Sequence, residues 1–425
     1  MRFANSRQTL VANFAQQGSA ASTLLILPNV LSKSAFAETV YVAVLLSFIA
    51  MADLGLNFVY SRIVPAMAMR GEIEAISNWD RTVHSFGLLA SLLFASAVSI
   101  SYFVKFHYLL NALLLLPVAP LTFLASFHVS RITSLGDFLA YRRVAVLRAL
   151  LAIGVLPLAY LWGVSGWFVG TLLAATMLLA YVRKISWISY LAIDWKLVYR
   201  HIGEGVQRCV IAVLWVQLMN VGRLYASTHY THSDIAEYGI AASAYQSLAA
   251  LVIAVFLPVS VETLRRFGHS TEDAMKYVHN VAERIAPWSL LGAIVVAELS
   301  PTIFRWVFPA YHLDSVILTT LLFGVITYPF SIIWGNCLVG ARRLLTYMAL
   351  ILFGLAIAWL VAIYFGSDKR GAAIGQFIGL LGYSLAMYLI APLALKTPLK
   401  IWFRAMLVFI VTIGLGVAYW IIRWM

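Results

Sequence analysis

Residues 345–366 read LTYMALILFGLAIAWLVAIYFG, and this stretch of 22 residues contains no charged side chain. Arg342 and Arg343 precede it, and Asp368 follows it. A bilayer core about 30 Å thick requires roughly 20 apolar residues per helix, so the stretch predicts a transmembrane helix. Similar runs recur along nearly the whole chain, from Leu10 to Trp424. The predicted fold class is therefore all-α, a polytopic membrane protein.

The composition of the whole chain agrees with this prediction. Of its 425 residues, 62% are hydrophobic and 11% are charged, and the mean hydropathy is +0.89, far from the values of soluble domains. A net charge of +13 would suggest a nucleic-acid partner in a soluble protein. Here the basic residues fall in loops between apolar runs, where they face anionic lipid, so no nucleic-acid partner is predicted.

Apolar runs bounded by charged residues, proline or glycine predict thirteen transmembrane helices. They cover residues 10–32, 39–60, 83–104, 109–128, 144–163, 165–182, 207–226, 237–259, 285–305, 316–339, 345–366, 371–395 and 402–422. With the amino terminus in the cytoplasm, 23 of the 30 lysine and arginine residues lie on or near the inner side. This asymmetry satisfies the positive-inside rule and supports a multi-pass topology with a cytoplasmic amino terminus.

The first of these helices has an alternative interpretation. Arg2 and Arg7, then an apolar stretch, then Ala35-Phe36-Ala37 resemble a cleavable signal peptide. Polar residues interrupt the stretch, however, and it is long for a signal core. We therefore expect a retained first helix.

The pattern of the first half repeats in the second half after a shift of about 199 residues, with low residue identity. Six helices per half is an even number, so the halves are predicted to be parallel lobes related by a pseudo-twofold axis along the membrane normal. The predicted divisions are an N-lobe over residues 1–183, a cytoplasmic amphipathic connector over 184–206, a C-lobe over 207–396 and an extra transmembrane helix over 397–425.

Polar side chains inside the predicted helices are costly when they face lipid, so they indicate a protein interior or a water-filled cleft. They concentrate in the first two helices of each half, where spacings of three and four residues put them on one helix face. These residues are Asn13, Gln16 and Gln17; Asp53 and Asn57, with Tyr60 beside them; Gln217, Asn220 and Arg223; and Ser243 and Gln246. We expect them to line a cleft between the lobes, although a hydrogen bond to a neighbouring helix explains any single amide or hydroxyl more simply.

Charged residues at membrane depth also need an explanation. The arginines within about two turns of the inner boundary are Arg62, Arg148 and Arg208. Their side chains either reach water or, if they face the cleft, form a cationic vestibule suited to phosphate. Two carboxylates are predicted well inside helices, Asp53 and Glu298. Asp53 indicates function or a salt bridge to an arginine, whereas Glu298 is predicted to pair with Arg305, seven residues later on about the same face.

A family resemblance rests on residues 52–56, ADLGL, followed by Tyr60 and Arg62. Together with residues 340–343, GARR, the short loops and the two parallel halves, this stretch resembles the Wzx oligosaccharide flippases. These belong to the multidrug/oligosaccharidyl-lipid/polysaccharide exporter superfamily. The resemblance covers most of the chain, and Asp53 and Arg62 hold the family's positions on the second helix.

The resemblance implies a transporter rather than an enzyme. Its substrate would be a polyprenyl-diphosphate-linked oligosaccharide, moved from the inner to the outer leaflet of the bacterial cytoplasmic (inner) membrane by alternating access, for surface polysaccharide biosynthesis. The implied partners are this lipid-linked oligosaccharide, membrane lipids, and polysaccharide polymerase and chain-length proteins. The resemblance implies no cofactor or metal, and it implies coupling to H+ or Na+.

Two alternatives remain open from the sequence. A multidrug or metabolite exporter of the related branch predicts a smaller cavity that is more apolar or anionic, whereas the flippase predicts a cationic one. A membrane glycan polymerase or ligase would need a large outer loop, but the longest outer loops are predicted to have about ten residues. His229, His232 and Asp234 cluster in one of them and are interpreted as surface residues, because no nucleophile or metal-ligand set completes a site.

Overall fold

The computed structural model describes residues 2–185, 191–267, 270–341, 343–366 and 368–424, and all its regular elements are helices. The chain divides into two units, residues 1–213 (unit one) and residues 214–425 (unit two), and α7 crosses the boundary. Unit one contains α1 (Arg2–Val30), α2 (Lys33–Leu46), η1 (Ile49–Met51), α3 (Leu56–Met69), α4 (Ile73–Phe106), α5 (Leu109–Ser134), α6 (Phe138–Ile185) and the first part of α7 (Trp195–His229). Unit two contains the rest of α7, α8 (His232–Phe267), α9 (Thr271–Val307), α10 (Ser315–Gly324), η2 (Val325–Thr327), α11 (Tyr328–Gly340), α12 (Leu344–Tyr364), α13 (Lys369–Ala394) and α14 (Leu399–Trp424).

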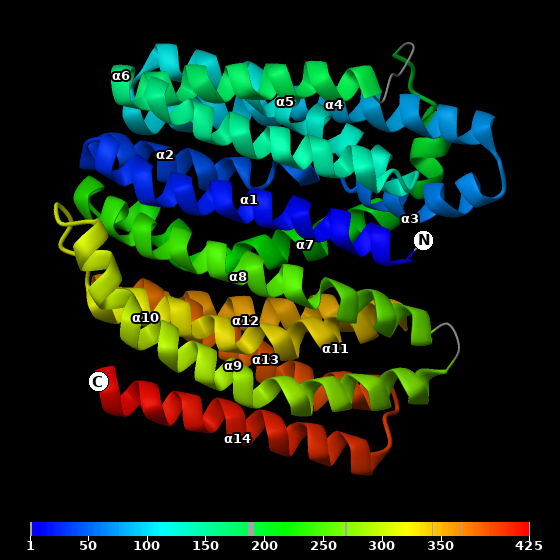
Figure 1. The fold of residues 1–425 in the computed structure, drawn as a ribbon, viewed down its shortest axis with the longest axis vertical. Helices are drawn as coiled ribbons and strands as arrows, with labels where there is room; N and C mark the ends of the chain where they lie inside the picture. The colour runs from blue at the N-terminus through cyan, green and yellow to red at the C-terminus, as the bar shows by residue number, and fades with distance from the viewer. Residues whose placement is uncertain (1, 186–190, 268–269, 342, 367, 425) are drawn as a thin grey trace. The chain divides into compact units, whose positions relative to one another are not determined.

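Long helices packed side by side form each unit (Figure 1). In unit one α1 packs on α6, and α5 packs on both α4 and α6. In unit two α12 packs on α13, α8 packs on α11, and α9 packs on α14. The last helix, predicted as an addition outside the repeat, is thus an integral part of unit two.

Nine helical segments in the described part of the chain are long and apolar enough to cross a membrane. Neither α1 nor α8 is among the nine. The 48-residue α6 counts once, although it holds two helices that meet at Trp162 and Gly163, whose backbone is not helical. This break lies where the sequence predicts the boundary between helices 144–163 and 165–182.

The predicted helix over residues 39–60 is wrong as a continuous helix. The chain leaves the α-helix at Ser47, passes through η1, and re-enters it at Leu56. Leu54 and Gly55 have positive φ angles of 54° and 80°, which a helix does not allow. Asp53 begins the second segment, because its carboxylate accepts hydrogen bonds from the backbone N–H groups of Gly55 (3.0 Å) and Asn57 (2.7 Å).

The segment directly before α7 is hydrogen-bonded to α4. The middle of the predicted connector, residues 186–190, lies outside the described residues, and residues 191–194 are not helical. Asp194 begins α7 by accepting hydrogen bonds from the N–H groups of Lys196 and Leu197, and its other oxygen accepts one from the Asn78 amide at 2.8 Å. The hydrogen bond from Asn78 lowers the pKa of the Asp194 carboxyl.

Glycine is required at position 55 for two reasons, the positive φ angle of the backbone there and the close approach of a neighbouring helix. A Cβ atom at this position would lie 2.1 Å from the carbonyl oxygen of Gly205 in α7. We expect Gly55→Ala to lower the free energy of unfolding by roughly 3 kcal/mol, from the positive φ and the overlap together. Thermal unfolding of the protein in detergent measures the effect. Gly203→Ala, in open space on the same helix as Gly205, is the control and should leave the unfolding temperature nearly unchanged.

Candidate functional site

A cavity of about 270 Å³ lies within unit one among α1, α5 and α6. Most of its wall is apolar, and its polar lining residues are Thr23, Thr122, Ser126, Arg148 and Thr171. Arg148 is the one charged side chain that lines it, within the part of the chain that the structure describes. The cavity is therefore an apolar space with a single positive charge in its wall.

The Arg148 guanidinium has no carboxylate partner among the described residues. Its electrostatic neighbour is the phenol of Tyr141, two turns earlier on the same face of α6, and the Gln16 side chain lies beside Tyr141. Two further residues of the predicted stripe on α1, Asn13 and Gln17, have side chains outside the described ones. A guanidinium in an apolar wall favours an anionic ligand, because no described carboxylate offsets the cost of removing its charge from water.

Two of the predicted arginines meet at one carboxylate. Arg62 Nη2 on α3 lies 2.6 Å from Glu204 Oε2, and Arg208 Nε on α7 lies 3.0 Å from Glu204 Oε1. Both guanidinium groups are partly exposed, with 46% and 26% of the side-chain surface accessible. Two positive charges beside one negative charge give this cluster a net positive charge, and it lies about halfway along α3 in unit one.

The other predicted residues of α3 have structural partners. Asp53 is fully buried and caps α3 through backbone N–H groups, which replaces the predicted alternative of a salt bridge to arginine. Asn57 donates its backbone N–H to this cap, and its side-chain carbonyl oxygen is buried. Tyr60 is fully buried and donates its hydroxyl hydrogen to Asp80 Oδ1 at 2.6 Å.

Asp80 is an important buried carboxylate that the sequence analysis missed. Besides the Tyr60 hydroxyl, it accepts a hydrogen bond from Arg131 Nε at 2.7 Å, which makes an ion pair between α4 and α5. Only 5% of the Asp80 side chain is exposed. One predicted helix begins at residue 83 and the next ends at residue 128. Asp80 and Arg131 were therefore assigned to cytoplasmic loops. Helices longer than the predicted apolar runs carry them into the interior.

In unit two the polar stripes of α7 and α8 join into one network around Arg223. This arginine donates hydrogen bonds to Gln246 Oε1 and to Ser243 Oγ, both at 2.6 Å. Gln246 in turn donates its amide to Asn220 Oδ1 at 2.5 Å. All these partners are neutral, and Arg223 is only 6% exposed. Four of the five residues predicted on these helices therefore lie together, and Gln217 is half-buried on α7.

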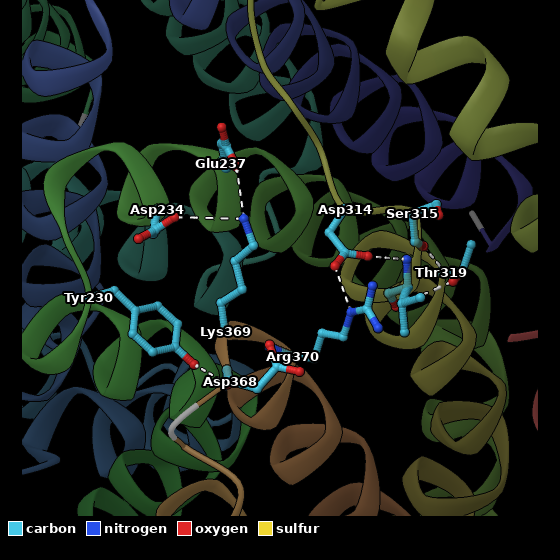
Figure 2. Close-up of polar contacts among 10 residues, drawn as sticks. Tyr230, Asp234, Glu237, Asp314, Ser315, Thr319, Asp368, Lys369 and Arg370 are labelled. Atoms are coloured by element: carbon cyan, nitrogen blue, oxygen red, sulfur yellow. Dashed lines mark hydrogen bonds and ion pairs between the residues drawn. The ribbon is translucent and has the colours of Figure 1, made fainter. Parts of the chain in front are cut away.

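Charged residues at the ends of α8, α10 and α13 form a separate cluster in unit two (Figure 2). Lys369 Nζ lies 3.7 Å from Asp234 Oδ1 and 3.6 Å from Glu237 Oε2, and Arg370 Nε lies 2.7 Å from Asp314 Oδ2. Asp314 also begins α10 by accepting the Val316 N–H. Asp234 is thus held in an ion-pair cluster, and the described residues contain no group of histidine, cysteine and acidic side chains that could hold a metal.

Glu298 does not pair with Arg305 as predicted. Its carboxylate accepts hydrogen bonds from Tyr419 and from Arg423 on α14, with Arg423 Nε at 3.1 Å from Oε1. The prediction considered partners on the same helix only, whereas α14 packs directly against α9. The interaction fixes the last helix to unit two.

Comparisons with known proteins identify the fold. No family model and no curated protein sequence matches the chain. The lipid II flippase MurJ in an inward closed conformation matches with a TM-score of 0.68 and 14% identity over 99% of this chain and 97% of that one. A mutant of the Vibrio cholerae MATE transporter VcmN matches with a TM-score of 0.64 and 14% identity over 94% and 97%. An outward-facing multidrug resistance MATE transporter matches with a TM-score of 0.63 and 18% identity over 92% and 94%.

These likenesses cover nearly the whole of each chain. They confirm the predicted fold class, an all-helical polytopic membrane protein with the two-lobe fold of MATE and MurJ. The chain thus has the fold of membrane transporters of the MOP superfamily, and these structural neighbours are transporters rather than enzymes.

Proposed function

We propose that this transporter is a flippase for a polyprenyl-diphosphate-linked oligosaccharide. It moves the substrate from the inner to the outer leaflet of the bacterial inner membrane by alternating access, for surface polysaccharide biosynthesis. The observation that carries the proposal is the position of Arg148 in the wall of an apolar cavity, without a carboxylate partner among the described residues. Such a wall suits a ligand that combines an anionic group with apolar surface, as a lipid diphosphate does.

The Arg62–Glu204–Arg208 cluster supports an anionic substrate further. Its net positive charge and partial exposure leave guanidinium donors available to a phosphate group, for which bidentate geometry is favourable. The similarity to MurJ, a lipid II flippase, is consistent with a lipid-linked substrate. In this proposal the polysaccharide polymerase and chain-length proteins act on the exported product, and H+ or Na+ supplies the driving force.

A matched pair of variants tests the role of Arg62. We expect Arg62→Gln to reduce export about tenfold, because one charge-assisted contact to phosphate is lost. Glu204→Gln should leave export within about threefold of wild type, because both arginines keep their charge and phosphate replaces the lost partner. Surface glycan, measured at equal protein levels in the membrane, is the readout. Equal losses in both variants would mean that Arg62 serves only to pair with Glu204.

The alternative function is export of drugs or metabolites, as in the MATE neighbours. The small volume of the cavity in unit one and its largely apolar wall favour this alternative. The positive charge of the wall argues against it for cationic drugs, because a cation entering the cavity would meet Arg148, and no carboxylate is among the described lining residues.

Deletion of the gene tests the proposed function. If the protein is a flippase, its deletion should make a lipid-linked glycan accumulate on the cytoplasmic leaflet and should abolish surface polysaccharide. The wild-type gene should reverse both effects. Unchanged surface polysaccharide together with increased drug sensitivity would favour the exporter and contradict the flippase.

A further inference from the structure

The first part of α9 is a polar extension of a transmembrane helix. The helix begins at Thr271, whereas its apolar run begins at residue 285, so about 14 residues, or roughly 20 Å, precede the predicted membrane boundary. Asp273, Lys276, Asn280 and Arg284 follow one another at spacings of three and four and lie on one helix face. The positive-inside prediction places this extension on the cytoplasmic side.

This face of α9 and the end of α8 line an open cavity of about 400 Å³. Its polar lining residues are Arg266, Asp273, Lys276, Tyr277, Asn280 and Arg284. Three cations and one carboxylate line it, and two of the cations, Arg266 and Lys276, are paired with Glu262 and Glu272 outside its wall. Arg284 has no carboxylate partner among the described residues, and the ion pair of Arg266 uses its Nε, so guanidinium donors remain for an anionic group such as a phosphate.

The cations of the cavity are already oriented. Arg266 lies with its guanidinium carbon 4.5 Å from the centre of the Tyr277 ring, and its Nε donates to Glu262 Oε1 at 2.9 Å. Its two terminal nitrogens have no partner among the described residues, and neither has the exposed guanidinium of Arg284. Lys276 is paired with Glu272 at 2.8 Å, outside the cavity wall. Donors for a bidentate contact therefore remain available.

An apolar cavity of about 280 Å³ continues the same face of α9 into the membrane. Trp288, one turn after Arg284, lines it together with Gly292 and Val296, and Val252 and Phe256 of α8 form part of the opposite wall. Trp288 is 72% exposed, which suits an indole ring at the headgroup layer. The α8–α9 face is thus cationic at the cytoplasmic end and apolar one turn further in.

We propose that this face binds an anionic phospholipid of the inner leaflet, with the phosphate between Arg266 and Arg284 and one hydrocarbon chain in the apolar cavity beyond Trp288. Basic pockets between helices on the cytoplasmic side are a recurrent means of binding lipid headgroups. The adjoining apolar cavity is the reason to choose a lipid rather than free phosphate. The site lies wholly in unit two, and it is independent of the transported substrate.

Native mass spectrometry of the full chain in a neutral detergent tests the site, with phosphatidylglycerol and phosphatidylcholine of identical acyl chains as probes. Phosphatidylglycerol should be retained at least fivefold more tightly than phosphatidylcholine. Arg266→Gln and Arg284→Gln should each weaken phosphatidylglycerol binding about fivefold. Arg404→Gln, which removes an exposed arginine of α14 outside the cavity, is the matched control and should have no effect.

A second variant tests the apolar half of the site. No atom lies within 4 Å of a Cβ placed on Gly292, so Gly292→Leu fills the cavity without a clash. This variant should weaken the binding of both phospholipids and leave the unfolding temperature of the lipid-free protein unchanged. Equal retention of the two phospholipids, or full phosphatidylglycerol binding by the double arginine variant, would overturn the proposal. Stabilisation by inorganic pyrophosphate alone, with no added effect of phospholipid, would overturn the assignment to a lipid.

Discussion

Replacing Arg148 with glutamine is expected to reduce transport of the lipid-linked oligosaccharide roughly 100-fold, because a charge-assisted contact in an apolar wall contributes about 2–3 kcal/mol. No second cation lines the cavity within the described residues, so no neighbouring side chain compensates. The variant should remain folded, because the guanidinium makes no described hydrogen bond or ion pair that its loss would break. Flipping of the lipid-linked substrate in proteoliposomes, at equal protein content, measures the effect.

Two controls make this prediction specific. Arg148→Lys keeps the charge and should retain about a tenth of the activity or more, since a lysine contacts phosphate as a point charge. Arg143→Gln removes an exposed arginine of the same helix that does not line the cavity, and it should leave transport unchanged. Full transport by Arg148→Gln would contradict the role of the cavity in binding an anion.

Asp80→Ala is expected to have the largest effect on stability. Removing a buried carboxylate leaves the Arg131 charge without its carboxylate and the Tyr60 hydroxyl without its acceptor, for a cost of about 3–5 kcal/mol. The ion pair joins α4 to α5, and the Tyr60 hydrogen bond joins α3 to α4. The loss should therefore appear as a large decrease in unfolding temperature in detergent and as a low level of protein in the membrane.

Two milder substitutions separate the contributions of the Tyr60 hydrogen bond and the Arg131 ion pair to stability. Tyr60→Phe removes one hydrogen bond and should cost about 1 kcal/mol. Asp80→Asn keeps one acceptor oxygen for the two donors and removes the negative charge, so its cost should fall between those of the other two variants. An unfolding temperature of Asp80→Ala equal to that of Tyr60→Phe would show that the Arg131 ion pair contributes nothing to stability.

The sequence analysis selected its candidate arginines by their depth in the membrane alone. Arg148 was selected for its distance from a boundary, and the structure places it in a cavity wall. Arg62 and Arg208 were selected in the same way. The spacing of four residues accounts for the Glu204–Arg208 pair, but nothing in the sequence indicated that Glu204 would also hold Arg62 from another helix. Partners on the same helix follow from spacing, whereas partners on different helices require knowledge of which helices are neighbours.

The failed predictions have the same physical origin. Glu298 was paired with Arg305 because only contacts along one helix are visible in a sequence, and α14 supplies its partners instead. The break at residues 52–55 was missed because apolar residues surround it. Asp53, as a possible helix cap, and Gly55 carried the local signals, and the requirement for glycine depends on the approach of Gly205 from α7.

The sequence by itself determined that this protein crosses a membrane many times, where most of its helices lie, and which polar residues need partners. These are local properties, since the length of an apolar run and the cost of a charge in lipid do not depend on the rest of the chain. Only the tertiary structure decided which charges are neutralised and which remain available to a ligand. That outcome depends on contacts between helices far apart in the sequence, and spacing along one helix carries no information about them.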